Sequence, residues 1–236
     1  FIEACQAGEV ARLKGFGQKT QDNILEGLLY MKSQKGKALY ADAEPQAQLL
    51  IEKLDEKYGS GCKMELTGNI RRKSEIVECV EVLVAGEPDE DLPGLLQKDG
   101  LVQTELKNSG PFTIRGRFTS TGLPFIVRFT DEKTFPGKLM LCTGSDNHLA
   151  SLGNEHGTLF SLAMAQSGLD ETAIYQSFGL PYIKPELRED IYNESFFREL
   201  EHKKLLDLQD IRGPFQCHTK YSDGQNTIRE LADYCI

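Results

Sequence analysis

The sequence lacks the features that would place this protein in a membrane or outside the cell. None of its apolar runs approaches the ~20 residues that a membrane-spanning helix needs, and no secretory leader is visible. Its six cysteines include no Cys-x-x-Cys pair and no spacing typical of a disulfide framework. We therefore expect a cytoplasmic protein with free thiols, and nothing that spans a membrane.

Positive charge is also scarce. The chain has 27 basic against 36 acidic residues and a net charge of −9. This balance argues against a protein that grips a nucleic acid over its whole surface, so any such contact must be local. The 236 residues suffice for one large domain or two small ones. Because the chain starts at Phe1 and stops inside an expected helix from Thr227, we expect it to be a fragment.

Helical and extended patterns follow one another along the chain and predict an α+β fold. Residues 1–33 predict short helices around the stretch LKGFGQKT, and 41–58 predict a longer helix with apolar residues at helical spacing. Asp170 opens a further helix with a capping pattern. The expected strands are 62–67, 76–85, 112–119 and 124–130.

The glycine-containing stretch LKGFGQKT predicts a phosphate contact. Gly15 and Gly17 permit backbone angles that other residues resist. The amides of Gly17, Gln18 and Lys19 would then face outward at a helix start, where the helix dipole favours an anion. A plain turn between two helices is the alternative interpretation.

A second stretch, TGNIRRKSEIVECVEVLV, combines a basic turn with an expected strand. Gly68 and Arg72 predict a phosphate-binding turn, although Arg71, Arg72 and Lys73 can equally form a solvated basic turn. Side chains alternate across a strand, so Cys79 and Glu81 should share one face. On that pattern Val77 and Leu83 lie with them, and Glu78, Val80, Val82 and Val84 lie opposite.

Three stretches in this order, LKGFGQKTQDNILEGL, TGNIRRKSEIVECVEVLV and LCTGSDNHLASL, resemble the bacterial family X DNA polymerases, relatives of polymerase beta. GPFQCHTKYSDGQNTIRELAD resembles the opening of the PHP phosphoesterase domain that bacterial members carry. The resemblance covers nearly the whole chain and implies a nucleotidyltransferase core. Its parts would be helix-hairpin-helix fingers over 1–45, a mixed or antiparallel palm sheet over 46–133, an α/β thumb over 134–190, a linker over 191–210 and a truncated PHP start over 211–236.

The resemblance also implies a reaction that needs two divalent cations, Mg²⁺ or Mn²⁺, about 3.5–4 Å apart. The family supplies an Asp-x-Asp pair and a third Asp, and these positions correspond to Cys79, Glu81 and Ile126. A thiol is a poor ligand for such hard ions and an isoleucine is none. One carboxylate remains where three are needed, so we expect the site to be inactive.

Other positions around the expected nucleotide pocket are changed as well, whereas the phosphate-binding residues persist. Leu141 and Cys142 stand where the family has an aromatic pair, and Leu149 and Gly153 stand at its Asn and Arg positions. The residues that the resemblance assigns to phosphate or nucleotide binding are Gly68, Asn69, Arg72, Thr143, Gly144 and Ser145.

Two alternatives concern metal ions. A rebuilt site could use Glu75, Glu78 and Glu81, but a spacing of three residues puts successive members on opposite strand faces. The PHP resemblance implies that His218 and Asp223 ligate metal, with the remaining ligands beyond residue 236.

The sequence thus predicts a family X polymerase-like protein that binds DNA in a repair context through backbone contacts, on gapped or primer-template DNA. A monovalent cation at the LKGFGQKT hairpin is possible for this family, and the sequence indicates no protein partner. Two alternatives stay open: a metal-dependent nuclease acting through the PHP domain, and an active gap-filling repair polymerase.

Overall fold

The computed structural model describes residues 1–34, 36–156, 168–177, 179–189, 194–199, 205–213 and 217–234. The chain divides into two compact units, Phe1–Arg198 and Glu199–Ile236. Within the described ranges, no helix combines the length and the apolar character that crossing a bilayer requires.

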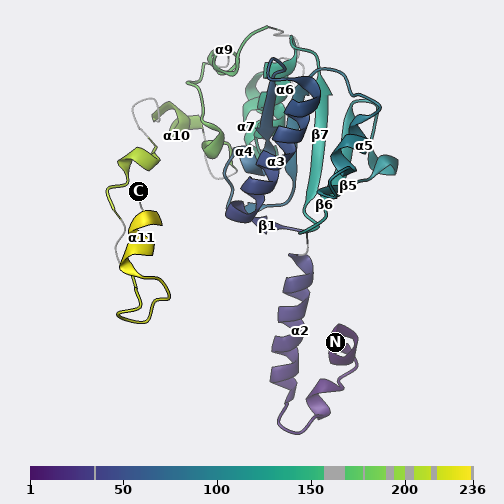
Figure 1. The fold of residues 1–236 in the computed structure, drawn as a ribbon, viewed down its shortest axis with the longest axis vertical. Coiled ribbons are helices and arrows are strands. Elements are labelled where there is room, and N and C mark those ends of the chain that lie inside the picture. Colours follow the sequence, from purple (N-terminus) through teal and green to yellow (C-terminus); the bar gives the residue numbers. More distant parts are fainter. Residues whose placement is uncertain are drawn as a thin grey trace. The chain divides into compact units, whose positions relative to one another are not determined.

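A five-stranded mixed sheet organises the first unit (Figure 1). The strand order is β2-β4-β7-β6-β5, in which β4 and β7 are parallel and the other neighbours are antiparallel. This arrangement confirms the predicted α+β fold with a mixed sheet. The strands are β2 (Met64–Thr67), β4 (Val80–Ala85), β5 (Val102–Thr104), β6 (Thr113–Phe118) and β7 (Pro124–Thr130).

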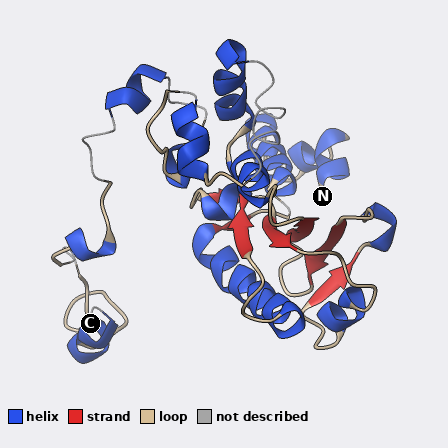
Figure 2. Cartoon of the chain, turned by 90° about the horizontal axis from the view of Figure 1, so that it is seen from above, coloured by secondary structure: helices blue, strands red, loops and turns tan. Residues whose placement is uncertain are grey.

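Helices pack on both faces of the sheet (Figure 2). On one face, apolar side chains of α3 (Tyr40–Tyr58) and α5 (Leu92–Gln97) form the main core with the even-numbered valines of β4. On the other face, α6 (Phe135–Thr143) packs through Phe135 and Leu139 onto Leu83. The predicted helix 41–58 is therefore confirmed, because its buried side chains Ala43, Ala47, Leu50 and Leu54 recur at helical spacing.

The strand predicted over 76–85 is not continuous. It is split into β3 (Ile76–Val77), which pairs with β1 (Ala38–Leu39), and β4, which starts at Val80 in the main sheet. The prediction that Val77 lies on the face opposite Val80 is wrong, since both are fully buried in the same core cluster. The break at Glu78 and Cys79 resets the alternation of side chains.

The remaining elements of the first unit connect and flank this core. Asp170 Oδ1 accepts the backbone N–H of Ala173 at 2.8 Å, which confirms the predicted capped helix. These elements are α1 (Ile2–Gln6), η1 (Val10–Arg12), α2 (Gln18–Ser33), α4 (Gly68–Arg71), η2 (Leu106–Asn108), α7 (Asp146–His156), α9 (Glu171–Ser177) and η3 (Pro185–Leu187), with α10 (Glu194–Glu199) at the unit boundary.

The second unit contains η5 (Leu208–Asp210) and α11 (Ile228–Tyr234). The helix expected from Thr227 is confirmed over the described residues, and Thr227 is capped by the carboxylate of Glu230. The five described cysteines are free, as predicted.

Candidate functional site

A polar cavity of about 710 Å³ lies where α4, β4, β7, the end of α6 and the start of α7 meet. It brings together most of the residues that the sequence assigned to phosphate and metal chemistry. Its lining comprises Gly68, Asn69, Arg72, Glu78, Glu81, Arg128, Leu141, Cys142, Gly144, Ser145, Asp146, Asn147 and Glu189.

The Glu81 carboxylate is already bonded to a side chain of the protein. Glu81 and Ile126 are register partners on the parallel strands β4 and β7. Arg128 lies two residues beyond Ile126, on the same face, and its Nη2 donates to Glu81 Oε2 at 3.0 Å. A guanidinium of the protein therefore neutralises this carboxylate.

Cys79 cannot replace the missing carboxylate. Burial, and then the neighbouring charge of Glu81, raise the pKa of the Cys79 thiol to about 12, although Arg128, Arg115 and Arg117 act in the opposite direction. Burial also raises the pKa of Cys142. Both shifts favour the protonated thiol, and sulfur is in any case a poor ligand for hard divalent ions.

These residues do not fit a pair of hard divalent ions. Cys79 supplies only sulfur, Ile126 supplies only hydrocarbon, and Glu81 is paired with Arg128. Among the described residues, no group of three or more His, Cys, Asp or Glu side chains is arranged to bind a metal ion.

The placement of Glu78 differs from the prediction. The strand break puts Glu78 and Glu81 on the wall of the same cavity, so the argument that they face opposite ways is wrong. Glu78 nevertheless pairs with Lys37 at 2.7 Å, and Glu75 is not part of the cavity lining.

Arg72, the expected phosphate ligand, forms an ion pair with Glu189, which lies 117 residues further along the chain. Its Nε donates to Glu189 Oε1 at 2.7 Å, its Nη1 donates to the carbonyl of Thr143 at 2.7 Å, and its side chain is 9% exposed. Ser74 donates to the same Glu189 oxygen at 2.9 Å. Overall, two arginines face four carboxylates (Glu78, Glu81, Asp146 and Glu189) across the cavity, so its net charge does not favour an anion.

The Thr143-Gly144-Ser145 segment contributes in three different ways. Thr143 is fully buried, and its hydroxyl donates to Leu139 and accepts from Arg71. Gly144 and Ser145 line the cavity, and Ser145 Oγ accepts the backbone N–H of His148 at the start of α7. The structure thus brings Gly68, Asn69, Arg72, Gly144 and Ser145 to one cavity but leaves the Thr143 side chain outside it.

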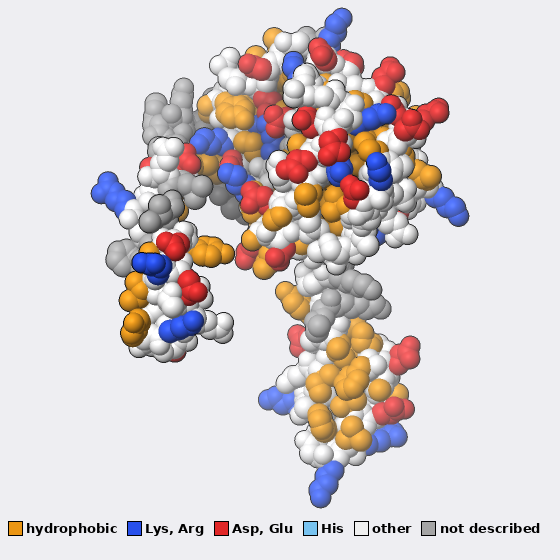
Figure 3. Space-filling view, in the orientation of Figure 1, with side chains coloured by type: hydrophobic (Ala, Val, Ile, Leu, Met, Phe, Trp, Pro, Cys, Tyr) orange, Lys and Arg blue, Asp and Glu red, His pale blue; other side chains and the backbone are white. Residues whose placement is uncertain are grey.

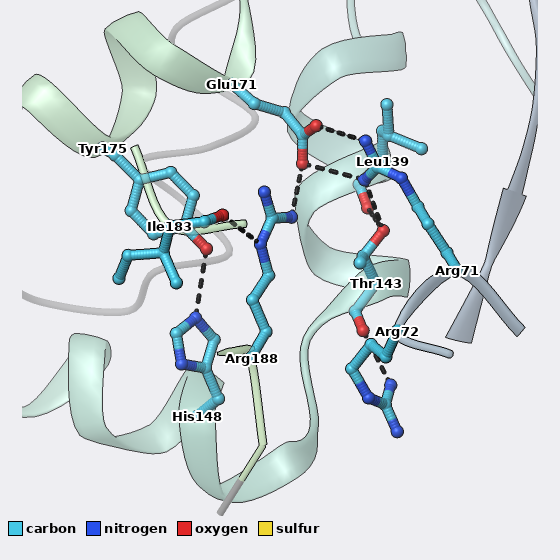
Figure 4. A network of polar contacts seen from close by, with 9 residues as sticks. All are labelled: Arg71, Arg72, Leu139, Thr143, His148, Glu171, Tyr175, Ile183 and Arg188. Carbon is cyan, nitrogen blue, oxygen red and sulfur yellow. Dashed lines mark hydrogen bonds and ion pairs between the residues drawn. The ribbon is translucent and has the colours of Figure 1, made fainter. Parts of the chain in front are cut away.

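A buried polar network joins α4, α6 and α9 behind this cavity (Figure 4). Arg71 donates to both carboxylate oxygens of Glu171, at 3.1 and 2.6 Å, and Arg188 Nη1 donates to Glu171 Oε1 at 2.5 Å. Burial would raise the pKa of Glu171, but the Arg71 hydrogen bonds and the charge of Arg188 lower it. Arg188 is fully buried and lies over the rings of Tyr175 and Tyr182.

The remaining predicted residues lie apart from the cavity. In the glycine stretch, Gly15 has φ +93°, a left-handed conformation that favours glycine, and Gly17 immediately precedes α2. Helix α2 begins at Gln18, so Gln18 and Lys19 lie in its first turn, as predicted. In the second unit, His218 Nδ1 contacts Asp223 Oδ1, while residues 214–216 lie outside the described residues.

The sequence of a bacterial protein aligns with almost the whole chain. The protein named DNA polymerase/3'-5' exonuclease PolX, from Bacillus subtilis (strain 168), is 28% identical over 252 aligned positions, which cover 99% of this chain. The chain is thus similar to a family X DNA polymerase over almost its whole length. It spans 42% of the length of that curated relative, and no family model matches it.

Two solved structures share the fold of this chain. Two crystal structures of Leishmania infantum polymerase beta, a ternary P/T complex and a ternary gap complex, match with TM-scores of 0.53 and 0.52. The matches cover 75% and 79% of this chain and 96% and 79% of the solved chains, at 14% identity. The polymerase beta-like fold predicted from the motifs is confirmed.

Two side chains at the candidate site were not predicted from the sequence, Arg128 and Glu189. Arg128 could have been found, because it lies two residues after Ile126 and must share its strand face. Glu189 could not, because its contact with Arg72 joins residues 117 positions apart without any local signal.

Proposed function

We propose that this chain is a DNA-binding, polymerase beta-like core, acting in DNA repair, whose nucleotidyl-transfer site does not assemble two metal ions. The observation that carries the proposal is the contact between Glu81 and Arg128 beside Ile126. The Arg128 guanidinium neutralises Glu81, the single remaining carboxylate. Ile126, the register partner of Glu81, has no oxygen that could bind a metal ion. The five cysteines that the structure describes form no disulfide, which supports a reducing, cytoplasmic setting.

Primer extension tests the loss of synthesis. The purified chain should incorporate no nucleotide on primer-template or gapped DNA with Mg²⁺ or Mn²⁺, because two hard ions find only one oxygen ligand group. Incorporation that Glu81→Ala abolishes would overturn this part of the proposal. Activity that survives Glu81→Ala would point to a contaminating polymerase.

DNA binding is supported by the start of α2. Helix α2 begins directly after Gly17, where the first amides have no intrahelical acceptor and Lys19 adds positive charge. On the face seen in Figure 3, acidic and basic side chains are interspersed, which agrees with a local contact.

Binding to gapped DNA should weaken with salt and with Lys19→Glu, but not with Lys98→Glu. Absence of binding at low salt would count against the role.

A second function is favoured by the second unit. His218 contacts Asp223 in the segment that resembles the start of a PHP domain, and the Bacillus subtilis relative is named a 3'-5' exonuclease. We propose that these two residues are metal ligands in the longer protein. Nuclease activity of that protein, lost in His218→Ala, tests this role independently of the core.

An active gap-filling polymerase is a weaker candidate, because the residues at 79, 81 and 126 oppose it.

A further inference from the structure

A second cavity, of about 340 Å³, lies at the carboxyl ends of the parallel strands β4 and β7. Glu81 and Ile126 lie towards the other ends of the same strands, and no residue lines both this cavity and the candidate site. The volume is at the low end of the ~300–1,000 Å³ that ligand cavities occupy. It suits one or two side chains of a ligand.

Two phenylalanines form the apolar part of the wall. Phe129 is 2% exposed, whereas Phe112 is 60% exposed. The backbone carbonyl of Phe112 accepts the N–H of Phe129 at 3.0 Å, and the N–H of Gly86 donates to Thr130 at 2.8 Å. An aromatic residue that is hydrogen-bonded to a strand, with its ring left exposed at a cavity, is available to an apolar group of a ligand.

The rim of this cavity is acidic. Three carboxylates, Glu87, Asp131 and Glu132, line it with a single base, Lys138. The Asp131 carboxylate is occupied, because its oxygens accept the N–H and the hydroxyl of Thr134 at 2.9 and 2.6 Å. Glu87 and Glu132 are exposed, and neither forms an ion pair with a residue that the structure describes. Two carboxylates are thus available to cations.

The negative charge continues beyond the cavity. Residues 87–91 have the sequence EPDED, and the Tyr58 hydroxyl holds the start of this segment by donating to the carbonyl of Glu87 at 3.0 Å. Of its four carboxylates, only that of Asp89 forms an ion pair among the described residues, with Lys57 at 2.7 Å. A ligand longer than the cavity therefore meets further carboxylates, which favours a basic peptide over a small cation.

We propose that this cavity binds a segment of a partner protein in which an aromatic side chain is flanked by lysine or arginine. The aromatic ring packs against Phe112 and Phe129, and the flanking cations pair with Glu87, Glu132 and the rest of the segment 87–91. Charge complementarity identifies the occupant, because an acidic rim attracts cations and repels acidic or phosphate-bearing ligands. This interaction surface is independent of DNA binding and of nucleotidyl transfer.

Fluorescence anisotropy of a labelled peptide tests the site. The probe has phenylalanine between two lysine–arginine pairs. One comparison peptide has alanine in place of phenylalanine, and another has glutamate in place of every basic residue. The wild-type chain should bind the probe, and more weakly as salt rises. The alanine peptide should bind about tenfold more weakly, because it lacks the aromatic anchor. The glutamate peptide should not bind.

Variants of the cavity locate the contact. Glu87→Gln with Glu132→Gln should weaken binding of the probe about fivefold, because two exposed ion pairs are lost. The matched control, Glu26→Gln with Glu52→Gln, removes two exposed carboxylates outside the cavity lining and should leave the affinity unchanged. Phe112→Ala should weaken binding about tenfold. Circular dichroism melting confirms that each variant is folded.

Phe112→Trp gives a direct readout of the cavity, because the chain contains no tryptophan. Its emission should shift to shorter wavelength as the probe is added, since the peptide covers the ring. Lys138→Gln removes the only base of the lining and should strengthen binding about twofold, a gain that misfolding cannot produce. Unchanged emission at saturating probe, equal binding of the probe and the alanine peptide, or equal losses in the carboxylate pair and its control would each overturn the site.

Discussion

Glu189 is the residue that most changes the chemistry expected of this site. Arg72 lies where a phosphate ligand is expected, but its guanidinium already donates to the Glu189 carboxylate. Ser74 donates to the same carboxylate oxygen. A carboxylate is a planar anion with two acceptor oxygens, so it satisfies a guanidinium much as a phosphate does. An internal carboxylate therefore competes with any phosphate for Arg72.

Replacing Glu189 with Gln should make the cavity accept polyphosphate. The substitution removes one of four carboxylates and replaces the ion pair of Arg72 with a weaker contact to a neutral amide. We expect the affinity for inorganic triphosphate, measured by calorimetry in EDTA, to rise about tenfold, or ~1.4 kcal/mol.

Glu78→Gln is the matched control, because Glu78 lines the same cavity but pairs with Lys37. It changes the net charge equally and should raise the affinity much less. Equal gains in the two variants would mean that net charge alone, rather than the Arg72 contact, excludes polyphosphate.

At the level of elements, the close approach of three strands depends on one glycine. Gly116 lies on β6 between β5 and β7, and a Cβ there would lie 2.5 Å from the Phe125 ring and 2.4 Å from the carbonyl of Gln103. The backbone carbonyl cannot move without disturbing the β5–β6 pairing. A side chain at 116 therefore separates strands as well as crowding a ring.

Gly116→Ala should lower the free energy of unfolding by about 2–3 kcal/mol, as overpacking of a tight interior does. Chemical denaturation measures the change. Gly94→Ala provides the comparison, because no atom lies within 4 Å of the added Cβ in α5. That change should be neutral or stabilise the helix by up to about 1 kcal/mol. A tolerated alanine at 116 would show that the strands can separate.

For the first unit as a whole, stability depends on charges that meet from distant parts of the chain. Glu171 links Arg71 and Arg188, which are separated from it by 100 and 17 residues. Removal of the shared acid leaves buried guanidiniums without a counter-charge, which is the most costly way to break such a network.

Glu171→Gln should therefore destabilise the first unit by about 3 kcal/mol in chemical denaturation. Glu186→Gln is the matched control, since Glu186 pairs with Lys73 at a site where the lysine side chain is 62% exposed. We expect that control to change stability by less than about 0.5 kcal/mol. Similar losses in the two variants would contradict a special role for the buried network.

His148 should make the stability of the same unit sensitive to mild acid. Burial, followed by the charges of Arg188 and Arg72, lowers the pKa of His148 from 6.5 to about 4. Below pH 6.5 the unfolded chain binds a proton that the folded one excludes, so stability is complete above that pH and declines towards pH 4.

Between pH 8 and pH 5 this group should remove about 2 kcal/mol of stability. Thermal melting of the wild type and His148→Gln at both pH values measures its share. The variant keeps a side chain able to bond the Tyr175 hydroxyl, which lies 3.0 Å from His148 Nε2. Identical pH dependence in the two proteins would show that the histidine is protonated without penalty.

The sequence by itself determined the mixed α+β architecture, the helix over 41–58, most strand positions and the similarity to family X polymerases. These follow from local periodicity and from motifs whose residues are neighbours in the chain. The identity of residues 79, 81 and 126 likewise needed no coordinates, since ligand chemistry depends on the type of atom.

Only the tertiary structure decided which charges meet. The break before Val80 moved Glu78 to the cavity wall, and chain reversal brought Glu189 to Arg72 across 117 positions. Pairing of β6 with β7 placed Arg115 opposite Ile126. Electrostatic partners are set by distances in space, and a sequence pattern fixes such distances only within one helix or strand.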